Sequence, residues 1–359
     1  MAAVVVGALV AMSTSLAIGA CSDSSDGTSE GDGGLRGPDG EILDEAGNPI
    51  DEAGNPIDGA KTDGPAGDTS TPPTGNSCAG LPATCGGSKD CCASNVVPGG
   101  TFNRSSDPAY PATVSEFKLD VFEVTVGRFR NFVNAGKGTQ GSAPAPGAGA
   151  NPKIPSSGWD ASFNTNLAAS TADLKVGLAC NPGYPAWSDA PGANENKPIN
   201  CVTWYDALAF CAWDGGWLPT EAEWNFAAAG GNEHREYPWG SGIDTTRASY
   251  DCGGDGSGTG APNCAFTDML PVGSKPAGDG KWGQSDLGGN VWEWTLDWAR
   301  TPYRLTSCTD CADLQTAPNK TFRGGGFPNE NFYLTTATRI DDVATDRDYD
   351  VGFRCARSP

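Results

Sequence analysis

The sequence predicts an α+β fold with little regular secondary structure, and three observations lead to this expectation. Glycine and proline, at 50 and 27 residues, together supply 77 of the 359 positions, and both types interrupt helices and strands. Regular spacing of apolar residues is clear only in 117–133 and 198–229. The 13 cysteines indicate that disulfide bonds help to hold such a loop-rich chain together.

The first regular stretch, residues 117–133, reads FKLDVFEVTVGRFRNFV. It begins with the alternation of a strand, and its second half, VGRFRNFV, has apolar residues at helical spacing. Residues 136–200 are rich in glycine, proline, asparagine and alanine, so we expect a long irregular excursion there. Beyond Gly230 no further helix is predicted.

The second regular stretch carries helix signals at both ends. Residues 206–213 have helical spacing, and the glycine pair 215–216 ends this helix. Thr220 is followed three residues later by Glu223, which is the pattern of a capping box. A further helix is therefore expected to begin at this point.

Composition and charge exclude several classes of function. The chain has 44 acidic and 23 basic residues, a net charge of −21, and no run of Lys and Arg that could follow a phosphate backbone. A nucleic-acid partner is therefore not expected. The single histidine, His234, excludes metal sites that need two or three imidazoles. The number of cysteines is typical of proteins in oxidising compartments.

The N-terminus has the features of a bacterial lipoprotein signal. Residues 1–20 are uncharged, and their short apolar core suits a signal peptide better than a transmembrane helix. They end in LAIGA directly before Cys21, which resembles the lipobox whose cysteine becomes lipidated. A signal peptide cleaved by another route, with Cys21 there by coincidence, is the alternative. We expect a lipid anchor at Cys21 in the bacterial cell envelope, and Ser22 is compatible with the outer membrane, on its periplasmic or exposed face.

Residues 21–77 are predicted to be a disordered acidic tether. Segment 22–77 has a net charge of −11, has almost no apolar residues, and repeats DEAGNPI at 44–50 and 51–57. Such a composition buries too little apolar surface to offset the conformational entropy of the chain. The tether would hold a folded domain away from the membrane.

A cysteine-rich collar, residues 78–95, is expected between the tether and a single large domain at 96–359. Four of its first 15 residues, CAGLPATCGGSKDCC, are cysteines, and few are apolar, so paired disulfides are expected to hold it. A zinc site would need free thiolates, which an oxidising compartment disfavours. Apart from Cys21, the remaining 12 cysteines are an even number, and Cys252 and Cys264 bracket a loop that they could close.

Several motifs in chain order resemble the sulfatase-modifying-factor domain, the family of the formylglycine-generating enzyme. The most specific are LPTEAEW and GNVWEWT, and the resemblance spans about residues 96–357. It implies a variant of the C-type-lectin-like fold that is stabilised by calcium and disulfides. The motifs are VPGGTF (97–102), FEVTVGRFRNFV (122–133), CVTWYDALAFCAWDGGWLPTEAEW (201–224), YPWG (237–240), LPVGSKP (270–276), SDLGGNVWEWTLDW (285–298), FRGGGF (322–327) and VGFRCA (351–356).

The resemblance also implies an oxidase centre, which this chain lacks. The copper(I) type uses two cysteine thiols that follow a Gly-Gly-Ser turn, but here the serine position is Gly326 and the thiol positions fall on Asn329 and Leu334. The iron type needs three imidazoles, and His234 is the only one. No catalytic residue is therefore assigned, neither copper nor iron is expected, and the chain is predicted to be a pseudoenzyme of this family.

A calcium site is expected at the motif DLGGNVWE. By resemblance its ligands are the side chains of Asp286 and Glu293 and the backbone carbonyls of Gly289 and Val291. Two hard carboxylates around a tight glycine turn suit calcium, whose remaining positions backbone carbonyls can fill. The alternative is a plain turn with two solvated acids.

A binding cleft is expected beside Trp292, because in the enzymatic relatives the cleft beside this tryptophan receives an extended peptide. Asn329, Glu330 and Arg339 are predicted to line it with Trp292, although most tryptophans serve packing. A cleft with Arg and Glu but no redox metal can hold a ligand. We therefore expect a binding or scaffold module for a peptide, protein or glycan. The alternative is a sulfatase-modifying oxidase with a rearranged site, for example at the C-x-x-C of Cys308 and Cys311.

Overall fold

The computed structural model describes residues 35–36, 42–43 and 75–359. The chain divides into two compact units, 1–64 and 65–359. In the first unit, strand β1 (Leu35–Arg36) pairs antiparallel with β2 (Ile42–Leu43). The predicted signal peptide, Cys21 and most of the predicted tether lie outside the described residues. No helix in the described part of the chain combines the length and the apolar composition that a membrane span requires.

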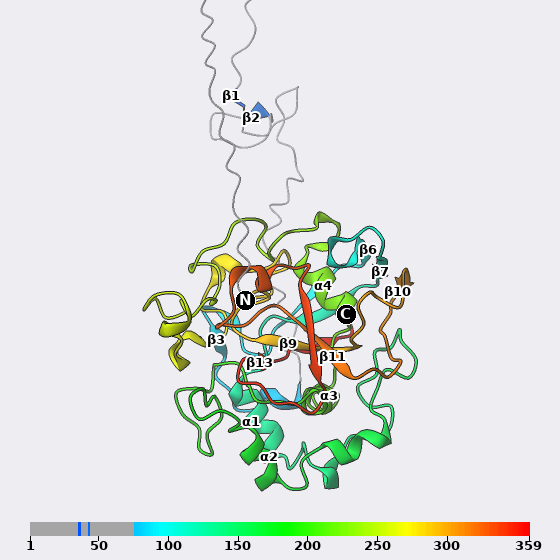
Figure 1. The fold of residues 1–359 in the computed structure, drawn as a ribbon, viewed down its shortest axis with the longest axis vertical. Coiled ribbons are helices and arrows are strands. Elements are labelled where there is room, and N and C mark those ends of the chain that lie inside the picture. The colour runs from blue at the N-terminus through cyan, green and yellow to red at the C-terminus, as the bar shows by residue number, and fades with distance from the viewer. Residues whose placement is uncertain (1–34, 37–41, 44–74) are drawn as a thin grey trace, which may run out of the picture. The chain divides into compact units, whose positions relative to one another are not determined.

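The second unit has the α+β class that the sequence predicts, with short helices and small sheets joined by long loops (Figure 1). Its α-helices are α1 (Val126–Asn134), α2 (Thr171–Gly177), α3 (Trp204–Trp213) and α4 (Glu221–Ala228). Short 3-10 helices interrupt the loops: η1 (Asn76–Cys78), η2 (Arg104–Ser106), η3 (Gln140–Ser142), η4 (Ala161–Asn166), η5 (Gly231–Glu233), η6 (Ala261–Asn263), η7 (Phe266–Asp268), η8 (Pro276–Gly278) and η9 (Asn331–Leu334).

The central sheet has four strands in the order β12-β11-β9-β13. β11 is antiparallel to both of its neighbours, whereas β13 runs parallel to β9. Helices α3 and α4 both pack against β9, which makes this strand the middle of the domain (Figure 1). The strands are β9 (Trp292–Trp298), β11 (Asn319–Arg323), β12 (Arg339–Val343) and β13 (Val351–Gly352).

Two three-stranded sheets, with the orders β14-β8-β5 and β10-β7-β6, and one small hairpin complete the unit. The pairing of β14 with β8 brings the C-terminal end of the chain beside a strand near the start of the domain. The strands are β3 (Thr84–Gly86), β4 (Lys89–Asp90), β5 (Ser94–Val97), β6 (Gly100–Asn103), β7 (Pro111–Val114), β8 (Phe117–Asp120), β10 (Cys308–Thr309) and β14 (Ala356–Arg357).

The predicted helices form where their capping residues lie. Thr220 accepts a hydrogen bond from the Glu223 amide (3.0 Å), and the Glu223 carboxylate accepts one from the Thr220 amide (2.9 Å), so the predicted capping box is confirmed. The helix expected over 206–213 begins earlier, at Trp204, because Thr203 forms a second capping box. Helix α2 was not predicted, since Leu174 is its one buried residue and a single apolar position creates no periodicity.

The main core lies between helices α1 and α3 and the central sheet, and it is largely aromatic. Phe129 stacks on Phe210 with ring centroids 5.7 Å apart, and Phe353 meets Phe210 edge-on at 5.3 Å. Trp294 of β9 packs edge-on against Phe322 of β11 at 5.0 Å. The aromatic side chains of the predicted elements therefore supply the core that the glycine-rich loops cannot.

All twelve described cysteines form disulfides, as the even count predicts. The collar contains two of them, the loop at 252–264 is closed, and the C-x-x-C is a local disulfide. The two collar disulfides and the closed loop confirm the structural roles expected from the sequence. The pairs are Cys78–Cys92, Cys85–Cys91, Cys180–Cys201, Cys211–Cys355, Cys252–Cys264 and Cys308–Cys311.

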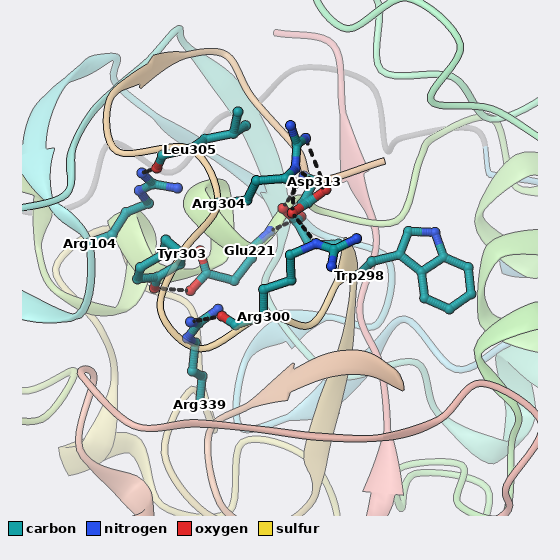
Figure 2. Close-up of a pocket in the computed structure, with 10 residues that line it drawn as sticks. Arg104, Glu221, Trp298, Arg300, Tyr303, Arg304, Leu305, Asp313 and Arg339 are labelled. Atoms are coloured by element: carbon teal, nitrogen blue, oxygen red, sulfur yellow. Dashed lines mark hydrogen bonds and ion pairs between the residues drawn. The ribbon is translucent and has the colours of Figure 1, made fainter. Parts of the chain in front are cut away.

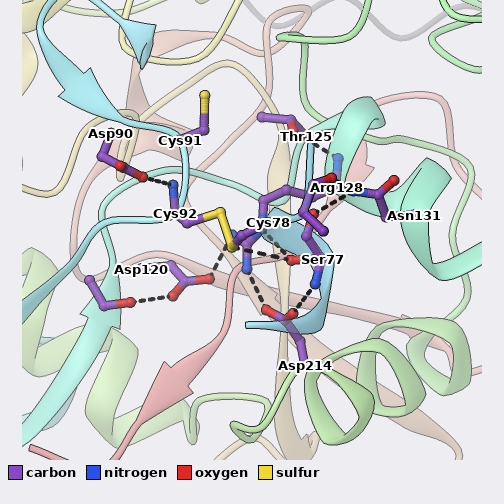
Figure 3. The surroundings of a disulfide bond; sticks show 12 residues. Ser77, Cys78, Asp90, Cys91, Cys92, Asp120, Thr125, Arg128, Asn131 and Asp214 are labelled. Carbon is purple, nitrogen blue, oxygen red and sulfur yellow. Dashed lines mark hydrogen bonds and ion pairs between the residues drawn. A yellow bond between two sulfur atoms is a disulfide. The ribbon is translucent and has the colours of Figure 1, made fainter. Parts of the chain in front are cut away.

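A buried charge network attaches the collar to the domain (Figure 3). Arg128 of α1 donates to the Ser77 hydroxyl (3.0 Å) and to the carboxylates of Asp120 (2.8 Å) and Asp214 (2.7 Å). The Ser77 amide also donates to Asp214 (2.7 Å), directly beside the Cys78–Cys92 disulfide. Ser77, directly before the collar, is therefore held by ion-paired side chains of the domain, and Lys89 of the collar itself pairs with Asp279.

Candidate functional site

A glycine turn follows β11 at the centre of the predicted site. Gly324 and Gly325 have φ angles of 104° and 75°, in the left-handed region that side chains other than glycine rarely occupy. A Cβ on Gly325 would also lie 2.6 Å from the side chain of Leu334. The turn therefore depends on both glycines, and it places Gly326 against Asp350 of the segment before β13.

The two positions where the resemblance would place thiols have structural roles in this chain. The Asn329 side-chain oxygen accepts a hydrogen bond from the Gly326 amide (2.8 Å), and the Asn329 amide donates to the Gly326 carbonyl (3.0 Å). Asn329 therefore closes the glycine turn. Leu334 is buried against Tyr237 and Ala248, and its side chain is part of a small apolar core.

Trp292 packs in the core rather than lining an open cleft. It is buried and meets Phe322 and Tyr333 edge-on, with ring centroids 5.3 and 5.9 Å away. Tyr333 is half-buried and contacts Phe332, whose centroid is 3.9 Å away and which is 52% exposed. A chain of aromatic contacts thus runs from Trp292 to the surface.

We name four residues near the glycine turn the aromatic surface: Trp239, Tyr250, Phe332 and Tyr333. Trp239, Tyr250 and Tyr333 are half-buried and pack on the small core around Leu334, and Phe332 projects beside them. Trp239 also lies parallel to the buried Tyr237, with centroids 5.2 Å apart. Glu330 is exposed and immediately precedes η9, which carries Phe332 and Tyr333.

Arg339 belongs to a different group of side chains from the other predicted cleft residues. Its guanidinium lies 3.6 Å from the centroid of the Tyr303 ring and donates to the Arg300 carbonyl. Trp292, Asn329 and Glu330 surround or flank the glycine turn, whereas Arg339 lies in a pocket lined by residues 297–305. The structure therefore does not bring the four predicted residues together as one group.

The sulfatase-modifying factor enzyme 1-like domain matches residues 86–359. The chain belongs to this family. A formylglycine-generating enzyme of Thermomonospora curvata is 28% identical over 308 residues, covering 74% of this chain and 93% of that protein. The inactive C-alpha-formylglycine-generating enzyme 2 of Mus musculus is 30% identical over 285 residues, covering 73% and 84%. The structure of PvdO from Pseudomonas aeruginosa superposes with a TM-score of 0.52 at 22% identity, over 78% of this chain and 99% of that one.

These matches confirm the predicted family and its C-type-lectin-like fold. The relatives include both a formylglycine-generating enzyme and a protein named as inactive, so membership of the family by itself does not assign an activity. What this member does must be argued from its own side chains.

The two carboxylates expected to bind calcium differ in how many hydrogen bonds they already accept within the protein. Both oxygens of Glu293 accept hydrogen bonds from Arg354 (2.7 Å each), and Glu293 Oε2 also accepts one from the indole N–H of Trp224 (2.8 Å). Asp286 accepts a hydrogen bond from the Gly273 amide (2.6 Å). The side chain of Asp286 is thus better placed to bind a cation than that of Glu293, which is fully buried in an ion pair.

Glu123 was missed in the sequence and lies in the same charged cluster. It is buried and accepts hydrogen bonds from Asn290 Nδ2 (3.1 Å) and the Val291 amide (3.3 Å). Burial, together with the neighbouring Asp286 and Glu293, raises the pKa of Glu123 well above its usual range. In the sequence Glu123 lies in the strand-like pattern FEV, and nothing in that pattern indicates a charged cluster.

The fit of this cluster to calcium is partial. Glu123, Asp286 and Glu293 surround the single guanidinium of Arg354, and burial and the repulsion between these carboxyl groups raise the pKa of Glu123, a repulsion that a cation would reduce. Over the described part of the chain, however, no three acidic, histidine or cysteine side chains are arranged to hold a metal ion together. Calcium at the four predicted ligands, Asp286, Gly289, Val291 and Glu293, stays a prediction.

Asp350 is a second residue that the sequence did not single out. It faces Gly326 across the glycine turn, and burial, followed by the charge of Asp348, raises its pKa to about 7. It is one of five aspartates between 341 and 350, so its sequence context resembles a solvated acidic stretch. Only the fold places this carboxyl group beside the turn.

A pocket beside β9 and β12 is lined by four arginines and by the carboxylates of Glu221, Asp297 and Asp313 (Figure 2). We name it the arginine pocket and define it by Arg104, Arg300, Tyr303, Arg304 and Arg339. Its cavity has a volume of about 10 Å³. Figure 2 shows Arg300 and Arg304 directed at one carboxylate, Asp313, while Arg104 and Arg339 lie on the side of Tyr303.

Proposed function

We propose that this chain is an envelope-anchored lipoprotein whose domain is a binding or scaffold module for a peptide, protein or glycan. In this proposal the domain keeps the fold of the formylglycine-generating enzymes without their copper or iron chemistry. The observation that carries it is the use of the two thiol positions: Asn329 closes the glycine turn, and Leu334 fills a core. The existence of a relative named as inactive supports the same idea.

The state of the cysteines also supports the proposal. Linear copper(I) sites need two thiolates, and each of the twelve described cysteines is bonded to another cysteine. Of the pair considered for a rearranged site, Cys308 begins β10, in the sheet with β7 and β6, and Cys311 follows that strand. The glycine turn follows β11, which belongs to the central sheet.

The aromatic surface is where we expect the ligand to bind. Phe332 is an exposed aromatic side chain whose ring contacts Tyr333 at a tilt of 33°, and half-buried aromatic rings with polar edges are typical of recognition sites. Glu330 and Asp251 lie next to it in the chain fold and can supply hydrogen-bond acceptors to peptide amides or sugar hydroxyls.

The competing oxidase hypothesis is tested by thiol titration and oxygen uptake. The full chain would be titrated with Ellman's reagent after denaturation without reductant, then supplied with copper(I) or iron(II) and a cysteine-containing sulfatase-type peptide. We expect no thiol from the domain, no peptide oxidation and no oxygen uptake. Two titrated thiols with peptide oxidation would overturn the proposal and make Cys308 and Cys311 the first residues to mutate.

The binding hypothesis is tested on a glycan array and a peptide library. We expect the wild-type chain to bind one ligand class and Phe332→Ala to weaken that binding. Val343→Ala is the matched control, because Val343 is also an exposed apolar side chain (42% exposed) but lies on the edge strand β12. Equal binding by Phe332→Ala and Val343→Ala would remove the aromatic surface from the proposal, and no binding at all would contradict the ligand role.

The lipid anchor is tested separately. Cys21 lies outside the described residues, so the proposal depends on its sequence context, LAIGA-Cys. We expect the wild-type chain to incorporate labelled fatty acid and to sediment with bacterial outer membranes, and Cys21→Ser to do neither. Label on both proteins, or on neither, would contradict the anchor.

A further inference from the structure

The arginine pocket contains a buried guanidinium without an ionic partner. Arg104 is 4% exposed, and its hydrogen bonds go to the backbone carbonyls of Tyr110 and Leu305. Over the part of the chain that the structure describes, no carboxylate lies within ion-pair distance of it. Burying a charge without a counter-charge is costly, so such a group is a candidate for binding an anion from outside.

The other buried arginines show that this is unusual for the fold. Each of them has at least one carboxylate within ion-pair distance, and two of the five have two. These residues and their partners are Arg128 with Asp120 and Asp214, Arg130 with Glu195, Arg323 with Glu221, Arg354 with Glu293, and Arg357 with Asp120 and Asp214.

Arg339 is half-buried rather than buried, but like Arg104 it lacks an ionic partner among the described residues. Its guanidinium hydrogen-bonds the Arg300 carbonyl. The carboxylate of Glu221 interacts electrostatically with Arg339, but it is already paired with Arg323 and accepts a hydrogen bond from the Tyr303 hydroxyl (2.6 Å). The Tyr303 ring lies 4.4 Å from the Arg104 guanidinium and 3.6 Å from that of Arg339, and so holds both in position.

Two further arginines lie where a ligand would enter. The side chains of Arg300 and Arg304 are 31% and 39% exposed, and both pair with Asp313. Together with Arg104 and Arg339 they place four guanidiniums around a cavity of about 10 Å³. A cavity of this volume accepts about one water-sized atom. One oxygen of an anionic group can therefore enter, while the rest of the group stays at the mouth.

We propose that the arginine pocket binds an oxyanion group, such as sulfate, phosphate or carboxylate. The planar fork of a guanidinium matches two oxygens of these groups, and charge-assisted hydrogen bonds of this kind are among the strongest in proteins. Four arginines and three carboxylates, Glu221, Asp297 and Asp313, line the pocket, so its lining has an excess of one positive charge although the chain has a net charge of −21. This site goes beyond the proposed function, because it shares no residue with the aromatic surface and does not depend on it.

The test is a titration of the full chain with sodium sulfate, sodium phosphate or sodium acetate, followed by calorimetry at constant ionic strength in chloride. We expect saturable binding of one anion per chain for at least one of the three. Arg304→Gln should weaken it about tenfold or more, because it removes charge-assisted hydrogen bonds. Arg247→Gln is the matched control, since Arg247 is similarly exposed (36%) and paired with Asp244 elsewhere, and it should bind like the wild type.

Arg339→Lys keeps the charge but loses the fork, and it should also weaken binding while circular dichroism shows an intact fold. Which of the three anions binds identifies the chemistry of the natural ligand. Absence of saturable binding by all three anions would overturn the proposal. Unchanged affinity in both Arg304→Gln and Arg339→Lys would do so as well, because the anion would then bind elsewhere.

Discussion

Asp120 is a buried carboxylate that forms ion pairs with two arginines. Its carboxylate pairs with Arg128 (2.8 Å) and Arg357 (3.0 Å), and it also accepts a hydrogen bond from Ser94 (2.7 Å). Burial on its own would raise the pKa of Asp120, but the two guanidiniums lower it to about 2. Because the same arginines also pair with Asp214, this one carboxylate stabilises the attachment of the collar and of the C-terminal strand together.

Because Asp120 stabilises the fold in its ionised form, its protonation should make the protein less stable in acid. The folded-state pKa lies below the usual value, so the stabilisation is present above pH 3.8 and is lost as the pH falls towards 2. This shift corresponds to about 2 kcal/mol of unfolding free energy. Urea unfolding between pH 7 and pH 2.5 would measure it.

Asp120→Asn should remove that acid dependence and cost about 3 kcal/mol at pH 7, because it leaves two buried guanidiniums short of a counter-charge. Asp189→Asn is the control, since Asp189 is exposed and should change little at any pH. The same acid dependence in Asp120→Asn and the wild type would contradict this assignment of the pKa.

Calcium binding is predicted to depend on Asp286. If the expected site forms, calcium at about 100 times its dissociation constant adds about 2.7 kcal/mol to the unfolding free energy. Millimolar calcium should therefore raise the melting temperature of the wild-type chain, and EDTA should lower it. Asp286→Asn should lose this response, whereas Asp244→Asn, at an exposed carboxylate, should keep it. A wild-type melting temperature that neither calcium nor EDTA moves would contradict the site.

At the scale of single elements, the helix caps differ in burial, and a buried cap should contribute more to the free energy of unfolding than an exposed one. The Thr220–Glu223 box lies in the core, because the Glu223 carboxylate also accepts hydrogen bonds from Asn151 (2.8 Å) and the Trp217 indole (3.2 Å). Helix α2 has a chemically similar cap at Ser170, but that cap is exposed.

Thr220→Ala should therefore destabilise the domain by at least about 1 kcal/mol, the usual cost of losing a cap. Ser170→Ala should cost only a few tenths of that, because the ends of α2 can fray without opening the core. Urea unfolding of the two variants compares them directly. Equal losses would mean that α2 is as tightly coupled to the domain as α4.

The elements also show what the sequence could predict. Helices α3 and α4 and the strand at 117–120 follow from apolar periodicity and capping residues, which are local signals. The cleft could not be predicted in the same way. Trp292 lies in the core and Arg339 beside Tyr303, and both positions depend on how β9, β11 and β12 pair.

The same limit applies to the groups that the sequence missed. Glu123, Asp350 and Arg104 are ordinary polar residues in their local sequence, and their environments come from segments far apart in the chain. The loss of a thiol can be predicted from a motif, because the sequence shows directly that the cysteine is absent. A cluster of charged side chains can be recognised only when the contacts between distant segments of the chain are known.

At the scale of the whole molecule, one disulfide spans more of the chain than any of the others among the described residues. Cys211 at the end of α3 is bonded to Cys355 just before β14, at a sequence separation of 144. Cys308–Cys311 closes a separation of only three. In the chain-entropy account, a cross-link stabilises by restricting the unfolded chain, and the effect grows with the logarithm of the loop length.

Replacing the long-range pair, by Cys211→Ala with Cys355→Ala, should therefore cost about 5 kcal/mol. Replacing the short pair, by Cys308→Ala with Cys311→Ala, should cost at most about 2 kcal/mol. Denaturant unfolding without reductant separates the two variants, and the slope against denaturant should rise only for the first, whose unfolded state expands most. If the short-range variant were the less stable of the two, Cys308 and Cys311 would hold more of the structure than a local loop. The chain-entropy account would then not describe the contribution of this pair.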